Sequence, residues 1–289
     1  MILPEFILPS KANQCWKSTG IDSLEMCVDK DWFKQYPHDV NYQYNSRGFR
    51  DAEWPDSIKE LQKAIWCVGD SFTVGIGSPI EHTWTHLLEQ VTRTNTINIS
   101  MDGASNNWIA RHAVQILDII KPTALVVQWS YLHRREGLTN LVDTRSFLIH
   151  YENVKGSEWP SITEVEQFSS LPVHIQTELL TLHDQSWRNN LSDEDLRLWH
   201  IKSDMQEDIS NTIDCIKLVD SCARDTKVIH GFIPGFALVG QSEFYQQLNS
   251  SSPLIHEISP QDLARDGHHY DIITARDFAD QVNRQLALI

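Results

Sequence analysis

The chain has 289 residues, of which 41% are hydrophobic and 22% charged, and a formal net charge of −15. This acidity argues against a nucleic-acid partner, because Lys and Arg on phosphates supply most of such binding, and against an anionic membrane surface. The sequence contains no run close to the roughly 18 consecutive apolar residues of a membrane-spanning helix, so we expect a globular protein acting on a small or neutral substrate.

Residues 1–57 read as an irregular N-terminal segment with scattered proline and aromatic residues. The first residues are apolar but include Pro4, Glu5 and Pro9 and no basic start, which is not typical of a secretory signal. Five cysteines occur without a CxxC pair, which favours a reduced, cytoplasmic location over a disulfide framework.

From residue 58 the chain alternates between strand and helix patterns. The expected elements are a short connector at 58–63, strands at 64–68, 96–99 and 124–129, and helices at 83–92 and 107–120. This alternation predicts a parallel sheet with helices on both faces.

The remaining chain contains a polar stretch and then returns to regular elements. We read residues 135–195 as a partly helical insertion or cap, with a helix N-cap signature at Ser192 and a lid over the site as a hypothesis. A long amphipathic helix at 195–222, a strand at 227–232 and a final helix at 274–289 follow. The prediction is a single domain, 1–289, with a three-layer α/β/α sandwich.

Ligands of such sheets bind outside the carboxyl ends of the strands, where this sequence places polar or glycine-rich turns. Ser71 follows the first strand of the sheet, in a Gly-Asp-Ser turn. A serine hydroxyl needs a general base and a group that orients the base. Asp266 and His269 stand three residues apart in one segment before the last helix, and this spacing favours His269 over His268 as the base.

Three motifs together resemble the GDSL-type or SGNH hydrolases. They are GDSFT at 69–73, an Asn-x-x-x-x-Gly loop ending at Gly103, and Asp-Gly-His-His at 266–269; the segment at 45–54 also looks like the one before the nucleophile strand in such proteins. The resemblance implies esterases or acetyl-transfer enzymes with a flavodoxin-like α/β/α fold. It also implies Ser71 as nucleophile, His269 as base and Asp266 as its orienter, with the N–H groups of Ser71 and Gly103 in the oxyanion hole.

The sequence departs from this family after the third strand. Family members commonly carry Gly-x-Asn-Asp there, whose Asn donates to the oxyanion, but residues 128–136 contain no Asn. Ser130, or Asn106 or Asn107 from the Gly103 loop, could supply the donor, or the hole has two donors only. GASN at 103–106 followed by W-S-x-x-x-R-x-E at 129–136 is similar to a divergent branch of this superfamily.

Other residues near the predicted turns have weaker signals. Asp70 is a candidate second carboxylate, but an acceptor of backbone N–H bonds that organises the turn is the favoured interpretation. Asp70, Trp129, Arg134 and His268 are candidate substrate contacts. Arg134 and Glu136 are expected to form a structural ion pair or to contact the edge of the substrate, and not to take part in the chemistry. The other histidines show no metal-ligand spacing, and the glycines at 75 and 77 lack the lysine of a phosphate-binding loop, so neither a metal nor an organic cofactor is expected.

The sequence therefore predicts a serine esterase that hydrolyses a short acyl ester of a small molecule or glycan, for example an O-acetyl group on a carbohydrate. Two alternatives stay open. One is an O-acetyltransferase with the same triad, in which a sugar hydroxyl replaces water. The other is a non-catalytic binding or structural protein that has kept the fold.

Overall fold

The computed structural model describes residues 6–18, 22–27, 36–132, 134, 205–233, 241–248, 250, 252–255 and 258–288. The expected insertion at 135–195, and the part of the predicted long helix before residue 205, lie outside the described residues.

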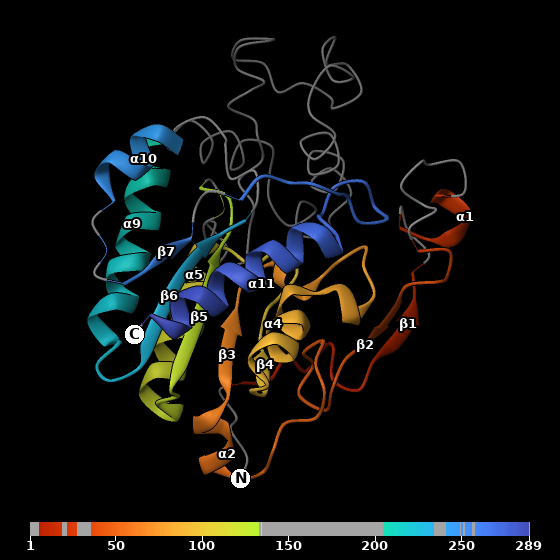
Figure 1. Cartoon of the computed structure of the whole chain (residues 1–289), viewed down its shortest axis with the longest axis horizontal. Helices are drawn as coiled ribbons and strands as arrows, with labels where there is room; N and C mark the ends of the chain where they lie inside the picture. The colour runs from red at the N-terminus through yellow and green to blue at the C-terminus, as the bar shows by residue number, and fades with distance from the viewer. Residues whose placement is uncertain are drawn as a thin grey trace, which may run out of the picture.

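A five-stranded parallel sheet forms the centre of the molecule (Figure 1). Its strands lie in the order β4 (Thr96–Asn98), β3 (Ile65–Val68), β5 (Ala124–Trp129), β6 (Lys227–Phe232) and β7 (Leu254–Ile255). Numbered along the chain this is 2-1-3-4-5, the flavodoxin-like order, in which the strand order reverses at the first strand. The predicted flavodoxin-like sheet is confirmed, and β5 and β6 have the bounds expected from the sequence.

Helices cover both faces of this sheet. On one face α4 (Trp84–Thr92) packs against α11 (Ile272–Ala287), and on the other α5 (Asn106–Gln115) packs against α9 (Met205–Cys222) (Figure 1). Every residue of β3, β4 and β5 is buried, as expected for parallel strands covered on both sides. The three-layer α/β/α arrangement is therefore also confirmed.

Some elements differ from the sequence predictions. The expected connector at 58–63 is a short helix, α2 (Ile58–Lys63), and the expected single helix at 107–120 is α5 followed by a π-helical turn, η3 (Ile116–Ile120). Short elements without a sequence signal are α3 (Ser71–Val74), η2 (Ile80–His82) and α10 (Gln241–Gln247). Within the described part of the chain, no helix is both long and apolar enough to cross a membrane.

The N-terminal segment is not wholly irregular. It contains a short helix, α1 (Leu24–Cys27), and two strands, β1 (Cys15–Lys17) and β2 (Asn41–Gln43), that pair antiparallel. Tyr42 and Tyr44 are buried on the same face of the chain and pack with Trp16. This small sheet lies on the side of the molecule away from α9 and α10 (Figure 1).

Candidate active site

Ser71 lies where β3 leaves the sheet and turns into the short helix α3. Asp70 caps this helix, since its Oδ1 accepts a hydrogen bond from the N–H of Phe72 at 3.0 Å. Ser71 is then the first helical residue, with only 2% of its surface exposed. An N–H in the first turn of a helix has no partner within the helix, so the cap leaves the Ser71 N–H available as a donor.

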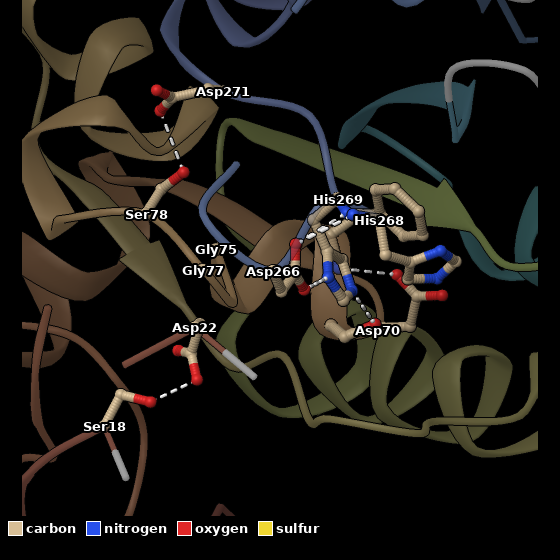
Figure 2. Close-up of polar contacts among 12 residues, drawn as sticks. Ser18, Asp22, Asp70, Gly75, Gly77, Ser78, Asp266, His268, His269 and Asp271 are labelled. Carbon is tan, nitrogen blue, oxygen red and sulfur yellow. Dashed lines mark hydrogen bonds and ion pairs between the residues drawn. The ribbon is translucent and has the colours of Figure 1, made fainter. Parts of the chain in front are cut away.

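The structure brings Ser71, His269 and Asp266 together. His269 Nε2 lies 2.8 Å from Ser71 Oγ, and His269 Nδ1 makes a short hydrogen bond to Asp266 Oδ2. Asp266 Oδ1 accepts the backbone N–H groups of His268 and His269, both at 3.0 Å (Figure 2). Each nitrogen of the His269 ring therefore has one partner of the kind that a nucleophile–base–carboxylate arrangement needs.

The pKa values of the two buried partners shift in opposite directions. Burial alone would raise the pKa of Asp266, but the nearby His269 lowers it, first by its charge and then by its hydrogen bond. Burial alone would lower the pKa of His269, but Asp266 raises it by the same two interactions. Asp266 is therefore a carboxylate near neutral pH, and it fixes the Nδ1–H tautomer of neutral His269, which leaves Nε2 free to accept the Ser71 proton.

His268 lies beside this arrangement and not within it. Its ring centroid is 4.8 Å from that of His269, and the ring of Phe72 contacts both imidazoles, at 4.5 Å from His269 and 5.8 Å from His268. The contact with Ser71 is made by His269, the histidine favoured by its spacing from Asp266. His268 and Phe72 are placed to form part of the wall around the base.

Asp70 points away from Ser71 into a buried polar cluster. Its Oδ2 accepts a short hydrogen bond from Ser130 Oγ and lies 3.1 Å from Arg134 Nη1. The carboxylate is fully buried, and this burial raises its pKa in spite of the nearby Arg134. Asp70 thus organises the turn, and Arg134 pairs with Asp70; the expected partner Glu136 is outside the described residues.

The side chains considered as a third oxyanion donor are engaged elsewhere. Asn106 Oδ1 accepts the N–H of Ser130 at 2.9 Å, and its Nδ2 donates to Tyr131 O and Thr212 Oγ1, both at 3.1 Å. The Ser130 hydroxyl is bonded to Asp70, and Asn107 Nδ2 donates to Asn211 Oδ1 at 2.8 Å. We therefore assign these side chains to holding the end of β5 against α5 and α9.

Trp129 belongs to the core and not to the surface of the site. Its side chain is completely buried, and its Nε1 donates to Nδ1 of His230 at 3.1 Å. His230 Nε2 in turn lies 3.0 Å from Asp220 Oδ1 on α9. The expectation that Trp129 contacts substrate does not fit this position, because the last residue of β5 points between the sheet and a helix.

The Gly103 loop lies next to the Ser71 turn. The N–H of Met101 donates to Gly69 O at 3.2 Å, and Ser105 then caps α5 through the N–H of Trp108 at 3.1 Å. Gly103 adopts a left-handed conformation, with φ of 71°, between these two fixed points. Among the described residues, the N–H groups of Ser71 and Gly103 donate to no other group.

A groove of about 620 Å³ lies away from Ser71, between the β1–β2 sheet and α4. Its walls include Asp51, Glu53, Glu81 and Glu89, but not Ser71 or its two partners. Glu53 and Glu89 accept hydrogen bonds from Ser46 and Thr96, and Asp51 accepts the N–H of Asn98, so these three carboxylates cap nearby backbone. Within the described ranges, no group of three or more His, Cys, Asp or Glu side chains is placed to hold a metal ion.

Comparison with known proteins gives distant structural matches only. No family model matches the chain. No curated protein matches it either. A lipolytic protein of the G-D-S-L family from Desulfitobacterium hafniense has a TM-score of 0.39 at 10% identity, covering 77% of this chain and 99% of its own. TesA has a TM-score of 0.41 at 12% identity, covering 78% and 98%. A family two carbohydrate esterase from Clostridium thermocellum has a TM-score of 0.42 at 11% identity, covering 83% and 67%.

Sequence reasoning missed the residues that hold the loop next to Asp266. It rejected a phosphate-binding loop at Gly75 and Gly77 and favoured backbone flexibility beside Ser71 as their role, and it gave no role to Tyr42 or Arg50. The usable signal was the pair of glycines directly after the Gly-Asp-Ser turn, where a left-handed backbone is needed twice, with φ of 78° at both.

Proposed function

We propose that this protein is a serine ester hydrolase of the SGNH type, with Ser71 as nucleophile, His269 as general base and Asp266 as the group that orients the base. The observation that carries the proposal is the contact of His269 Nε2 with Ser71 Oγ at 2.8 Å, with Asp266 on the other ring nitrogen. The three residues come from two loops almost 200 positions apart, 198 between Ser71 and His269.

In the acylation step, Ser71 Oγ attacks the ester carbonyl while its proton moves to His269 Nε2. The charge of Asp266 stabilises the imidazolium that forms, and Asp266 itself stays ionised. The imidazolium then donates this proton to the leaving alcohol, which leaves an acyl group on Ser71. Water, deprotonated by His269 in the same way, hydrolyses the acyl-enzyme and restores the free serine.

The negative charge that develops on the carbonyl oxygen needs donors that are already in place. We assign this role to the N–H groups of Ser71 and Gly103, because neither has another partner among the described residues. Each such donor is worth about 3 kcal/mol of the barrier in serine hydrolases. The hole then has two backbone donors and lacks the Asn side chain of the usual third block.

A short acyl group suits the surroundings of Ser71. The rings of Phe72 and His268 contact the ring of His269, and Phe72 packs in turn against Tyr131, with centroids 6.2 Å apart. Bulky rings beside the base favour a small acyl group such as acetyl. The alcohol part is either a small molecule or a glycan.

Replacement of the nucleophile tests the proposal. Ser71→Ala is expected to lower kcat on p-nitrophenyl acetate by about 10⁴-fold or more and to abolish labelling by a fluorophosphonate probe, because Ser71 supplies the hydroxyl that bonds His269 in the described part of the chain. Ser221→Ala is the matched control, since Ser221 is an exposed serine on α9 whose described hydrogen bonds go to Leu218 and Cys222 of the same helix. Equal labelling of the wild type and Ser71→Ala would refute the nucleophile, and no labelling of the wild type would favour a binding protein.

A further inference from the structure

The loop Gly75–Ser78 packs against Asp266. At Gly77, where φ is 78°, an added Cβ would lie 2.9 Å from Asp266 Oδ1 and 3.0 Å from its Cγ. The carbonyl of Gly77 also accepts the N–H of Arg265 at 3.0 Å. The backbone of the loop therefore passes close beside the Asp266 carboxylate and is hydrogen-bonded to the residue before it; Figure 2 shows Gly75 and Gly77 next to Asp266.

Tyr42 on β2 holds the middle of this loop. Its hydroxyl accepts the N–H of Gly77 at 2.8 Å and donates to Asp22 Oδ2, which fixes the direction of the hydroxyl proton. Asp22 also accepts a hydrogen bond from Ser18 (Figure 2). Burial and then the charge of Asp22 raise the pKa of Tyr42, so the hydroxyl keeps its proton over the working pH range.

Arg50 holds both ends of the same loop. Its guanidinium donates through Nη1 to Gly75 O and through Nη2 to Ser78 O at 2.7 Å and Asn41 O at 3.3 Å. The side chain is buried, with 3% of the residue exposed, and its guanidinium lies 4.4 Å from the ring centroid of Tyr42. The buried Arg50 side chain therefore links the two ends of the loop to Asn41 on β2.

We propose that Tyr42 and Arg50 are positioning residues for the proposed hydrolysis. They hold the Gly75–Ser78 loop against Asp266 and so fix the carboxylate that orients His269. The inference rests on the proposed function for its catalytic meaning, but the placement of Asp266 is a structural property that can be measured without turnover. Neither residue contacts Ser71 or His269, so both act through the loop.

The readout is the pKa of His269, because it depends on how close Asp266 stays. Among the described residues, the titratable groups that affect the His269 pKa or lie against its ring are Asp266 and His268 from its own segment, Asp70 from the β3–α3 turn and Asp102 from the Gly103 loop. Tyr42 and Arg50 are not in this set. Tyr42→Phe removes no charge, because the Tyr42 hydroxyl is neutral, so we expect it to change the His269 pKa through the loop and the position of Asp266.

Tyr42→Phe is the principal test, since it removes the acceptor for the Gly77 N–H and keeps the ring. We expect the His269 pKa, followed by NMR on protein labelled at histidine Cε1 and assigned with His269→Gln, to fall. We also expect kcat on p-nitrophenyl acetate to fall about 10-fold with KM unchanged, and the acid limb of the kcat profile to move to lower pH. Loss of folded protein alone would lower the rate by the same factor at every pH and would leave the midpoint of the pH profile unchanged.

Tyr44→Phe is the matched control. Tyr44 lies two residues further along the chain, is buried on the same face, and stacks on Trp16 with centroids 4.9 Å apart, without a bond to the loop among the described contacts. It should leave both the His269 pKa and kcat unchanged. Equal His269 pKa values in the wild type, Tyr42→Phe and Tyr44→Phe would overturn the inference.

Arg50→Lys supplies a second, independent variant. It keeps the charge but loses the planar fork that reaches both ends of the loop, so it should move the His269 pKa in the same direction as Tyr42→Phe. Arg47→Lys, on a residue whose guanidinium lies over Trp54, is its control. If Ser71 is not labelled in the wild type but Tyr42→Phe and Arg50→Lys still move the His269 pKa, the proposed function fails and the positioning role stands.

Discussion

Two buried carboxylates lie close to Ser71, and their surroundings give them different roles. Asp266 accepts two backbone N–H groups and the His269 ring, and its pKa is lowered although burial alone would raise it. Asp70 is more deeply enclosed, and burial raises its pKa even beside Arg134. A pair of titratable groups whose pKa values are pushed apart is typical of an active site. Asp266 is therefore the carboxylate with a stable charge facing the base.

The raised pKa of His269 predicts the pH dependence of the proposed activity. Only neutral His269 can accept the Ser71 proton, so kcat/KM should fall on the acid side with a midpoint above the ordinary pKa of histidine. Asp266→Asn removes the charge that raises this pKa, so the acid limb should move to lower pH and the rate should fall by about 10⁴-fold at its optimum, because the tautomer is no longer fixed.

Rates on p-nitrophenyl acetate between pH 5 and pH 9 would measure this. Asp118→Asn is the matched control, because it removes one exposed carboxylate on η3 without a link to His269. An acid limb at the same pH in the wild type and in Asp266→Asn would contradict the assignment of Asp266 as orienter.

At the scale of elements, the long apolar ones were predictable and the short ones were not. β5 and β6 are six residues each and almost wholly buried, so their apolar runs mark both ends. β1, β2 and β7 have three, three and two residues, which is too short for any period to show. The π-helical turn after α5 keeps the apolar side that a continuous α-helix would have, so composition cannot separate the two.

Gly77→Ala should damage the contact between two loops. Alanine at φ of 78° costs about 1–2 kcal/mol in backbone conformation, and its Cβ would also collide with the Asp266 carboxylate at 2.9 Å. Gly103→Ala is the matched variant for stability, because φ is similar, at 71°, and nothing lies within 4 Å of the added Cβ. Urea denaturation should show a larger loss of unfolding free energy for Gly77→Ala than for Gly103→Ala. Equal losses would mean that the contact with Asp266 costs nothing beyond the backbone strain.

A second prediction at this scale concerns the link between β6 and α9. Burial alone would raise the pKa of Asp220, but hydrogen bonds from His230 and two serines lower it to about 2. A carboxylate whose folded pKa lies below its unfolded value, about 3.9, stabilises the fold above that value and loses the effect as pH falls toward the folded pKa. Asp220→Asn should therefore lower the free energy of unfolding by about 1–2 kcal/mol at pH 6, and the difference should shrink toward pH 3.

Chemical denaturation at several pH values would measure this difference. Asp225→Asn, which lies in the turn between α9 and β6, is a suitable control. A difference that stays constant from pH 6 to pH 3 would show that the effect comes from lost packing and not from the charge of Asp220.

At the scale of the whole molecule, the candidate site is assembled from distant parts of the chain. The nucleophile turn and the Asp266 segment could be predicted, because each carries its chemistry in a few adjacent residues. The contacts of Tyr42 with Gly77 and of Asp70 with Arg134 join residues 35 and 64 positions apart, and no local pattern records such pairing. The same reason explains why the sequence suggested Ser130 and Asn106 as oxyanion donors. Their residue types and positions suit that role, but their actual hydrogen-bond partners are set by the fold.

The Asp70–Arg134 pair links the ends of β3 and β5 across the site, and it gives the last prediction. Among the described residues, Arg134→Gln would leave the buried Asp70 with the Ser130 hydroxyl and the Phe72 N–H as partners, so the free energy of unfolding should fall by about 3–5 kcal/mol. The double variant Asp70→Asn with Arg134→Gln should recover part of this loss, because no unpaired charge is then buried. Lys59→Gln, an exposed cation on α2, is the control for loss of one positive charge. Urea denaturation of the wild type and these three variants would test the prediction. If Arg134→Gln unfolds at the same urea concentration as Lys59→Gln, the ion pair does not hold the two strand ends together. A contact with substrate would then be the remaining candidate role of Arg134.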